Sequence, residues 1–163
     1  LFKKMKKIPL SQGLFALVDD EDFEELNQFK WCALKAPKTF YAIRRANNSK
    51  NPTIYMHRII LGLTDSKIHC DHRDNNGLNN QKYNLRPCTN SQNQKNKSYS
   101  TNGTSKYKGV SKIKNCATWI VRIYVNGKNI SFTGFRCEIE AAKKYDEMAK
   151  LYYGEFAWLN FKE

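Results

Sequence analysis

The most regular hydrophobic pattern lies toward the C-terminal end of the chain. Two sets of side chains alternate from residue 119 to 125, with Trp119, Val121, Ile123 and Val125 in one set and Ile120, Arg122 and Tyr124 in the other. A period of two residues is typical of a strand with one buried face. Asn126-Gly127 follows and favours a tight hairpin, because both turn positions adopt positive φ. We therefore expect residues 130–135 to form the partner strand and residues 107–113 to form a third.

The hydrophobic period then changes to that of a helix, over residues 138–153. Positions i, i+4, i+7, i+8 and i+11 fall on one helical face and carry Ala141, Tyr145, Met148, Ala149 and Tyr152. Gly154 stands where a helix commonly ends in the left-handed conformation. The pattern predicts a three-stranded antiparallel sheet packed on one helix, as a domain over residues 106–163.

Shorter segments in residues 1–60 predict a small β/α segment. Strands are expected at residues 8–10, 14–18, 31–34, 40–43 and 53–56, and a short helix at residues 57–62. Acids favour the positive N-terminal end of a helix, so the run from Asp19 to Asp22 is interpreted as a helix start rather than a metal site. Phe23, Leu26 and Phe29 are expected to form the buried face of that helix.

A polar, Asn-rich stretch separates these regions. Residues 61–97 form the predicted central domain, and residues 98–105 are predicted to be a linker because Gly, Ser and Asn dominate there. The predicted fold class is α+β.

The net charge is +13, and it is concentrated away from the N-terminus: residues 31–105 carry twelve Lys or Arg and three acids. Such a field attracts polyanions and makes their binding sensitive to salt. Charge alone would also suit a membrane surface or a ribosomal protein.

The cysteine pattern and the hydrophobicity limit which classes of protein this chain can belong to. The five cysteines lie far apart without a Cys-x-x-Cys pair, so buried reduced thiols in a cytoplasmic protein are expected, with no structural zinc and no disulfide framework. No apolar run approaches the roughly 20 residues that span a bilayer, so no membrane partner is expected. Because the chain begins with Leu1 rather than Met, the natural start is expected further upstream and targeting stays open.

The candidate chemistry lies at Asp71-His72, followed by Asn84 and Asn93. A carboxylate and an amide oxygen suit a hard divalent cation. A neighbouring neutral imidazole can take a proton from a water that attacks phosphorus, and a metal can shield the charge on the phosphoryl oxygens. Asn75-Asn76-Gly77 and Asn79-Asn80 are interpreted as turn residues.

This stretch resembles the HNH nucleases of phage and intron homing type. The pattern is Asp-His, a polar loop from Arg73 to Tyr83, Asn84-Leu85-Arg86, and a short helix with Ser91-Gln92-Asn93, where Asn replaces the last His. The resemblance implies a ββα-metal finger in which His72 is the general base, Asp71 and Asn93 bind the metal, and Asn84 braces the loop and so orients His72. Mg²⁺ is the expected ion, with Mn²⁺ as an alternative. In the similar lead-in before the finger, His57 either supports the site or packs beside it.

The C-terminal segment is similar to the Apetala-two/ethylene-response-factor DNA-binding domain. The similarity rests on Tyr107-Lys108-Gly109-Val110, Trp119, Phe135, Ala141-Ala142, Tyr145-Asp146 and residues 154–161. It implies that a sheet face binds duplex DNA, with Lys108, Lys112, Lys114, Arg122 and Tyr124 as candidate contacts. Arg86, in the predicted finger, is a further candidate DNA contact. Ser111 and Ile113 stand where plant members carry Arg, and one glycine is shifted by a position to Gly134, so no base specificity is carried over.

Together these observations predict a monomeric, metal-dependent DNA endonuclease that nicks one strand per finger, in the cytoplasm on nucleoid DNA or in a phage-infected cell, without an obligate protein partner. A non-catalytic DNA-binding regulator is the main alternative. A basic RNA-binding protein ranks third, since only charge and aromatic content favour it.

Overall fold

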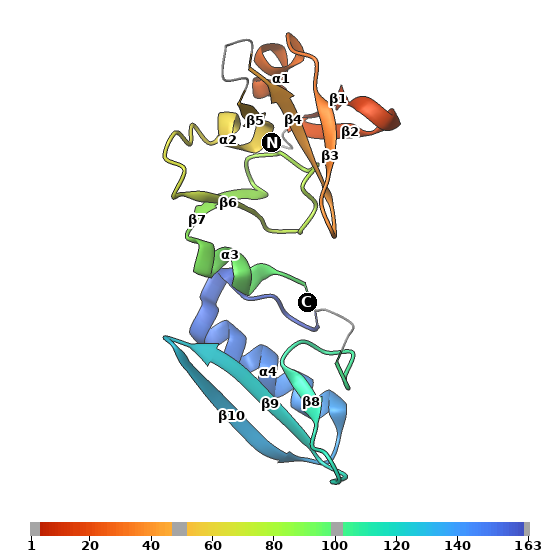
Figure 1. Cartoon of the computed structure of the whole chain (residues 1–163), viewed down its shortest axis with the longest axis vertical. Helices are drawn as coiled ribbons and strands as arrows, with labels where there is room; N and C mark the ends of the chain where they lie inside the picture. Colours follow the sequence, from red (N-terminus) through yellow and green to blue (C-terminus); the bar gives the residue numbers. More distant parts are fainter. Residues whose placement is uncertain (1–3, 47–51, 99–102, 162–163) are drawn as a thin grey trace. The chain divides into compact units, whose positions relative to one another are not determined.

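The computed structural model describes residues 4–46, 52–98 and 103–161, and it divides into two compact units, Leu1–Asn93 and Gln94–Glu163. Figure 1 shows the small sheets and α-helices of this mixed α/β chain. The predicted α+β class is therefore confirmed at the level of mixed small sheets and helices.

The first unit begins with two small sheets and two helices. Its elements are β1 (Met5–Pro9), the 3-10 helix η1 (Ser11–Gly13), β2 (Phe15–Asp19), α1 (Asp20–Asn27), β3 (Cys32–Lys35), β4 (Phe40–Arg45), β5 (Thr53–Tyr55) and α2 (Met56–Ile60). Strands β1 and β2 form an antiparallel pair, and the other sheet has the order β3-β4-β5. Apolar side chains from both sheets and both helices share one core, which includes Ile8, Ala16, Val18, Leu26, Trp31, Ala42 and Met56.

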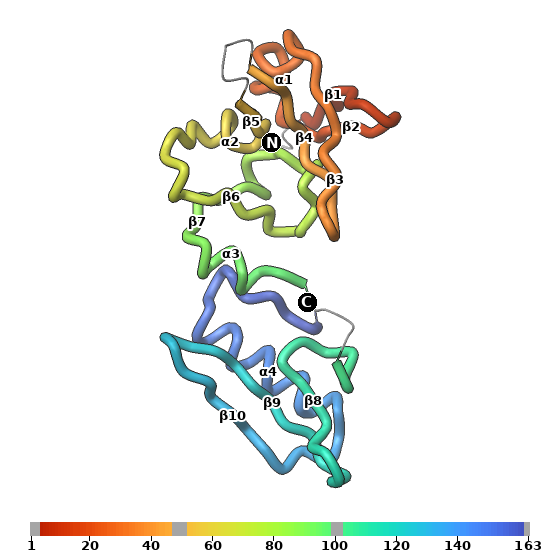
Figure 2. The backbone as a smooth tube through the Cα atoms, viewed as in Figure 1, coloured from red at the N-terminus to blue at the C-terminus, as the bar shows by residue number. Residues whose placement is uncertain are grey.

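A second strand pair and the first half of a helix complete this unit, which ends at Asn93. Strands β6 (His69–His72) and β7 (Leu85–Cys88) are antiparallel, and α3 (Asn90–Asn96) follows directly. The loop between them, which can be followed in the trace of Figure 2, is attached to β2. The amide of Leu17 donates to the carbonyl of Leu78, and the amide of Asn80 donates to the carbonyl of Leu17, each at 2.8 Å. The loop therefore rests on the edge of the N-terminal sheet.

The helix that starts at the acidic run is shorter than its hydrophobic pattern suggested. It ends at Asn27. Of the three predicted core residues, Leu26 is buried and Phe23 is partly buried against the core. Phe29 lies beyond the helix end and is 42% exposed, with the guanidinium carbon of Arg44 4.1 Å from its ring centroid. The prediction of Phe29 as a buried face residue is wrong, because its ring packs against a cation at the surface instead of against the core.

The second unit is a three-stranded sheet with a helix. Its elements are β8 (Val110–Lys112), β9 (Trp119–Val125), β10 (Lys128–Phe135), α4 (Glu138–Tyr153) and the 3-10 helix η2 (Gly154–Phe156), with the strand order β10-β9-β8. The predicted hairpin is confirmed, since Asn126 and Gly127 both have positive φ, 48° and 80°. The core joins the sheet to α4 through Val110, Val121, Ile123, Ala141, Ala142, Tyr145, Met148 and Ala149.

Two glycines explain local features of this sheet. A Cβ on Gly109, whose φ is +75°, would lie 2.0 Å from the Tyr145 ring, so this close approach of strand and helix requires glycine. Gly134 has a φ of +90° inside a register shift between Phe132 and Phe135. The shifted glycine of the sequence pattern therefore coincides with an irregularity in β10.

Some predicted burials differ from the structure. Tyr152 is 39% exposed, because Ala149 and Tyr153 pack against the core in its place. The five cysteines are free, but Cys88 is the buried one, Cys70 is half-buried, and Cys32, Cys116 and Cys137 are exposed. The expectation that these thiols are buried is thus wrong for most of them.

Half of the predicted linker over residues 98–105 lies outside the described residues, namely residues 99–102. Its last residue, Ser105, is buried and donates a 2.7 Å hydrogen bond to Glu138 Oε1 at the start of α4. In the described parts of the chain, no helix combines the length and the apolar character needed to cross a membrane.

Candidate active site

Asp71 and His72 are the last two residues of β6, and both side chains are buried. In the ladder with β7, Asp71 lies opposite Arg86 and His72 lies opposite Leu85. Residues directly opposite each other in an antiparallel pair point to the same face. The guanidinium of Arg86 accordingly reaches Asp71, with its Nη2 at 2.6 Å and its Nε at 2.7 Å from Oδ2.

Aromatic rings pack around His72. Its ring centroid lies 5.1 Å from that of His57, edge to face, and 5.8 Å from that of Tyr41. Burial lowers the pKa of His72 below its usual value of 6.5. The neutral imidazole is thereby favoured, which is the form that can accept a proton.

His57, on α2, is also buried, and its Nδ1 has no hydrogen-bond partner among the described residues. Burial, with the nearby His72, lowers the pKa of His57 to about 3. His57 therefore packs as a neutral ring against His72 and the rings of Tyr41 and Tyr55.

Asn84 connects the two ends of the loop between β6 and β7. Its Nδ2 donates to Asp74 Oδ1 at 2.9 Å and to the carbonyl of Asn79 at 2.8 Å, and its Oδ1 accepts from the Asp74 amide at 3.0 Å. Asn79 Nδ2 in turn donates to Asp74 Oδ2 at 2.8 Å. A fully buried amide with these bonds fixes the path of the loop.

Asn93 lies near the start of α3, and a reciprocal pair of hydrogen bonds fixes that start. The Gln92 amide donates to Thr89 Oγ1 at 3.2 Å, and the Thr89 amide donates to Gln92 Oε1 at 2.8 Å. This is the capping box of a helix N-terminus. Within the described residues the Asn93 side chain has no hydrogen bond, so its amide oxygen is available to a ligand.

The two predicted metal ligands both carry oxygen donors. Asp71 offers a carboxylate and Asn93 offers an amide oxygen, and hard cations prefer oxygen ligands. Arg86 compensates the buried carboxylate through Oδ2, and a carboxylate has capacity for more than one partner.

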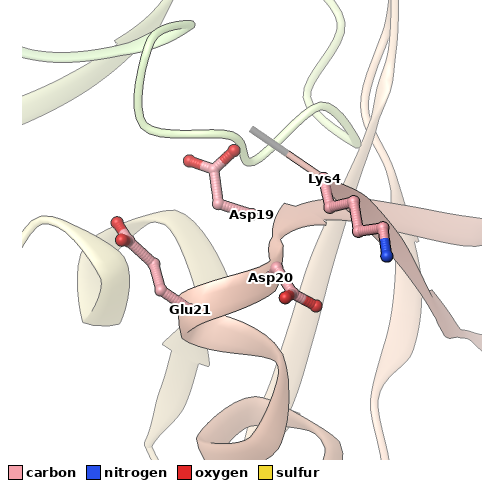
Figure 3. Close-up of a pocket in the computed structure, with 4 residues that line it drawn as sticks. All are labelled: Lys4, Asp19, Asp20 and Glu21. Atoms are coloured by element: carbon pink, nitrogen blue, oxygen red, sulfur yellow. The ribbon is translucent and has the colours of Figure 1, made fainter. Parts of the chain in front are cut away.

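A second group of acids, Asp19, Glu21 and Asp22, has oxygens within 4.8 Å of one another. Figure 3 shows Asp19 and Glu21 beside each other at the start of α1. The ammonium of Lys82 lies 2.8 Å from Glu21 and 2.9 Å from Asp22, and its pKa is raised by hydrogen bonds to both carboxylates. Asp19 accepts hydrogen bonds from the Gln81 side chain and the Lys82 amide. The positive charge that balances these acids is therefore the ammonium of Lys82. The cluster anchors the loop between β6 and β7 to α1.

The predicted DNA contacts fall into two groups. Arg86 is buried on Asp71, and the ammonium of Lys108 donates to the carbonyls of Lys95 and Lys97 at 2.6 and 2.8 Å, so both side chains are engaged inside the protein. In contrast, the second unit exposes the side chains of Lys112, Lys114, Arg122 and Tyr124.

The sequence did not identify Arg86 as the partner of Asp71, nor Asn80 as a neighbour of His72. Asn80 Oδ1 lies 3.5 Å from His72 Nε2. The first contact depends on the register of β6 and β7, and the second depends on how the loop folds back. The available signal for Arg86 was strand pairing. Asp71 and Arg86 lie equally far from the two ends of the loop between β6 and β7, so pairing of the flanking strands places them opposite each other.

Comparison with known proteins gives one informative similarity. No family model and no solved structure matches the chain. The chain is 32% identical, over 147 residues, to an uncharacterized HNH endonuclease of Acanthamoeba polyphaga mimivirus, and the alignment covers 90% of this chain and 74% of that protein. It spans both units and so includes all the candidate residues described above.

Proposed function

Because this chain belongs to the HNH endonuclease family, we propose that it is a metal-dependent enzyme that hydrolyses phosphodiester bonds in duplex DNA. In this proposal β6, β7 and α3 form a ββα-metal finger. The observation that carries the proposal is a buried imidazole, whose pKa is lowered by burial, directly after a buried carboxylate at the end of one strand, His72 after Asp71.

We assign His72 the role of general base. Its unprotonated nitrogen takes a proton from a water molecule, the water oxygen attacks phosphorus, and the bond from phosphorus to the 3′ oxygen breaks. The leaving oxygen is protonated by solvent. The rings packed against His72 hold the imidazole in place.

Asp71 and Asn93 are the proposed ligands of a divalent cation, with Mg²⁺ first and Mn²⁺ second. When bound, such an ion shields the negative charge that develops on the phosphoryl oxygens. Arg86 holds the Asp71 carboxylate in a fixed orientation, and Asn84 holds the loop that packs over His72. Arg86 also balances the negative charge of this buried carboxylate.

The second unit is the proposed DNA-binding domain, similar to the Apetala-two/ethylene-response-factor type. Arg122 and Tyr124 project from β9 on the face opposite the core residues Val121 and Ile123. Across the ladder, Ser131 lies opposite Arg122 and Asn129 lies opposite Tyr124, so this face is polar. Such a strand face can contact base edges in the major groove, and exposed Lys112 and Lys114 supply charge for the phosphates.

A supercoiled plasmid incubated with the protein tests the proposal. We expect relaxed, singly nicked circles with Mg²⁺ or Mn²⁺, none with EDTA, and none with His72→Ala. His69→Ala is the matched control, because His69 lies on the same strand, and it should cut like the wild type. Tight DNA binding with no cutting under any divalent ion would instead favour a DNA-binding regulator.

A further inference from the structure

Tyr41 lies at the centre of the aromatic cluster beside His72. It is on β4, and its ring centroid lies 5.8 Å from that of His72, 5.7 Å from that of His57 and 6.3 Å from that of Tyr55. The rings of Tyr55 and His57 also pack against each other at 5.3 Å. Rings packed in this way hinder one another's rotation. Tyr41 is therefore held in place against the proposed general base.

The loop between β6 and β7 closes on one edge of the Tyr41 ring. A Cβ on Gly77 would lie 2.6 Å from both Cδ1 and Cε1 of this ring and 2.4 Å from the carbonyl oxygen of Phe40, so only glycine permits the approach. The Gly77 amide donates to Thr39 Oγ1 at 2.9 Å and fixes the contact. Gly77, which the sequence pattern assigned to a turn, thus also holds the ring of Tyr41.

The hydroxyl of Tyr41 is free to bind a ligand. Tyr41 is half-buried, and among the described residues no group forms a hydrogen bond with its hydroxyl. Whereas His57 Nδ1 is withdrawn from solvent without a partner, the Tyr41 hydroxyl still reaches solvent. Burial raises the pKa of Tyr41 above its ordinary value of 10.0, and so do nearby acidic groups that include Asp71. The hydroxyl therefore keeps its hydrogen at neutral pH and can donate it to an acceptor.

Two arginines close to the site are already engaged inside the protein. Arg86 is paired with Asp71. The guanidinium of Arg58, the residue after His57 on α2, donates to three backbone carbonyls, those of Leu63, Asp65 and Ile68, at 3.2, 2.7 and 2.7 Å. Neither arginine can reach a phosphate without giving up these bonds. The free donor in contact with His72 is instead the neutral phenol of Tyr41.

We propose that the Tyr41 hydroxyl donates a hydrogen bond to a non-bridging oxygen of the phosphate that is cut, which makes Tyr41 a further catalytic residue. This inference rests on the proposed function. Negative charge grows on the non-bridging oxygens as water attacks phosphorus, so a donor already in place lowers the barrier. Tyr41 keeps its hydrogen throughout, and no bond to it forms or breaks. Because a phenol is neutral, it does not repel a divalent cation on Asp71.

A spectrum without metal tests the contact independently of cutting. The nine tyrosines are replaced by 3-fluorotyrosine, and Tyr41→Phe and Tyr55→Phe assign the two ¹⁹F signals of interest. The probe is the tightest-binding duplex selected from a random-sequence DNA pool, added in EDTA. We expect the Tyr41 signal to shift when the duplex binds. The Tyr55 signal should shift far less, because the Tyr55 ring packs on Tyr41 and His57 rather than on His72.

The rate of cutting tests the catalytic role. Removing one fixed donor from a water-excluded site costs about 100- to 1,000-fold in rate, and a half-buried hydroxyl should contribute less. For Tyr41→Phe we therefore expect the single-turnover rate to fall about 10- to 100-fold while DNA affinity stays within about twofold. Tyr55→Phe is the matched control, since it also removes one phenolic oxygen from the ring cluster, and it should cut within about twofold of the wild type.

Sulfur substitution identifies the atom that Tyr41 contacts. Sulfur accepts hydrogen bonds only weakly, so replacing the contacted non-bridging oxygen by sulfur should slow the wild type. The same replacement should slow Tyr41→Phe much less, because that variant has no hydroxyl to lose its acceptor. We expect this difference for one of the two phosphorothioate diastereomers. A purely structural role of Tyr41 would leave the effect of sulfur the same in both proteins.

The outcomes separate this inference from the proposed function. An unmoved Tyr41 signal with bound duplex, or a Tyr41→Phe variant with unchanged rate, overturns the role of Tyr41. The variant removes no hydrogen bond of the folded protein, so its urea midpoint should match that of the wild type. A clearly lower midpoint would show that the hydroxyl is bonded within the protein and would also overturn the inference. A protein whose Tyr41 signal moves with DNA but which never cuts would instead overturn the proposed function and leave the phosphate contact intact.

Discussion

Arg86 and Asp71 lie opposite each other on β7 and β6, and both Nε and Nη2 of Arg86 donate to one oxygen of the Asp71 carboxylate. The side chains are 6% and 3% exposed, so the pair is almost entirely withdrawn from water. A buried charge without a partner is costly, and each member of this pair supplies the opposite charge for the other. The proposed metal ligand is therefore positioned by a neighbouring strand, and Arg86 has a structural partner where a DNA contact had been predicted.

Arg86→Met should strongly destabilise the first unit. Removing one member of a buried ion pair leaves an uncompensated charge and typically costs about 3–5 kcal/mol. The double variant Arg86→Met/Asp71→Leu should recover part of this loss, because neither charge remains. Urea unfolding measures both, and a single variant that costs less than about 1 kcal/mol would contradict the pairing.

Asn93→Ala should weaken metal use while leaving the fold unchanged. The side chain is half-buried and is not hydrogen-bonded within the described residues, so its loss leaves no unsatisfied partner. We expect the Mn²⁺ concentration for half-maximal cutting to rise at least about tenfold. Gln94→Ala, at the next position of α3, is the control. An unchanged Mn²⁺ requirement would remove Asn93 from the ligand set.

Stability should fall in acid because of His57. Its pKa in the folded protein is about 3, below the ordinary 6.5, so the unfolded chain binds the proton more tightly. The neutral ring contributes fully above pH 6.5, and this contribution declines as the pH falls toward 3, by about 1.4 kcal/mol per pH unit. Between pH 7 and pH 5 the loss from this group is roughly 2 kcal/mol.

His57→Phe isolates that effect. The variant keeps a ring but cannot be protonated, whereas His72 titrates in both proteins. Urea midpoints at pH 7 and pH 5 should therefore differ less for His57→Phe than for the wild type. Equal acid sensitivity of the two proteins would show that His57 is not buried as a neutral ring.

Arg122→Ala should weaken DNA binding in a salt-dependent manner. The guanidinium lies on the outer face of β9, where its Nη1 donates to Ser111 Oγ at 2.9 Å. If it neutralises one phosphate, the slope of log affinity against log salt should decrease by about 0.9. Fluorescence anisotropy with a labelled duplex at several salt concentrations gives this slope. An unchanged slope and affinity would place the DNA on another surface.

Lys108→Met should lower stability and leave the slope of log DNA affinity against log salt unaltered. The ammonium binds the carbonyls of Lys95 and Lys97 at the end of α3, which are groups that a helix leaves without partners. Losing these bonds should cost about 1–3 kcal/mol. If the slope of log affinity against log salt decreased and stability did not change, Lys108 would instead contact a phosphate, as the sequence predicted.

Sequence reasoning worked best where one periodicity decides the structure. The alternation around Val121 and the Asn126-Gly127 turn fixed a hairpin, and the helix bounds Glu138–Tyr153 were predicted to the residue. Burial at element ends was less predictable. Phe29 and Tyr152 fit a helical face, but the helix ends before Phe29, and the last turn of α4 turns Tyr152 to solvent.

The supporting contacts of the site were less accessible from sequence. Asn80 has the composition of a turn residue, and only the return of the loop onto Leu17 carries it to His72. The pairing of Arg86 with Asp71 needs the register of two strands that are separated by twelve loop residues. Neither relation follows from local propensity, because both depend on contacts that are distant in sequence.

The most direct test of the account is anomalous diffraction from crystals of the protein with duplex DNA and Mn²⁺. We predict a Mn²⁺ peak bound by oxygens of Asp71 and Asn93, with a DNA phosphate beside it and His72 facing that phosphate. A Mn²⁺ peak on Asp19, Glu21 and Asp22 instead, or His72 directed away from the phosphate, would contradict the assignment of this site.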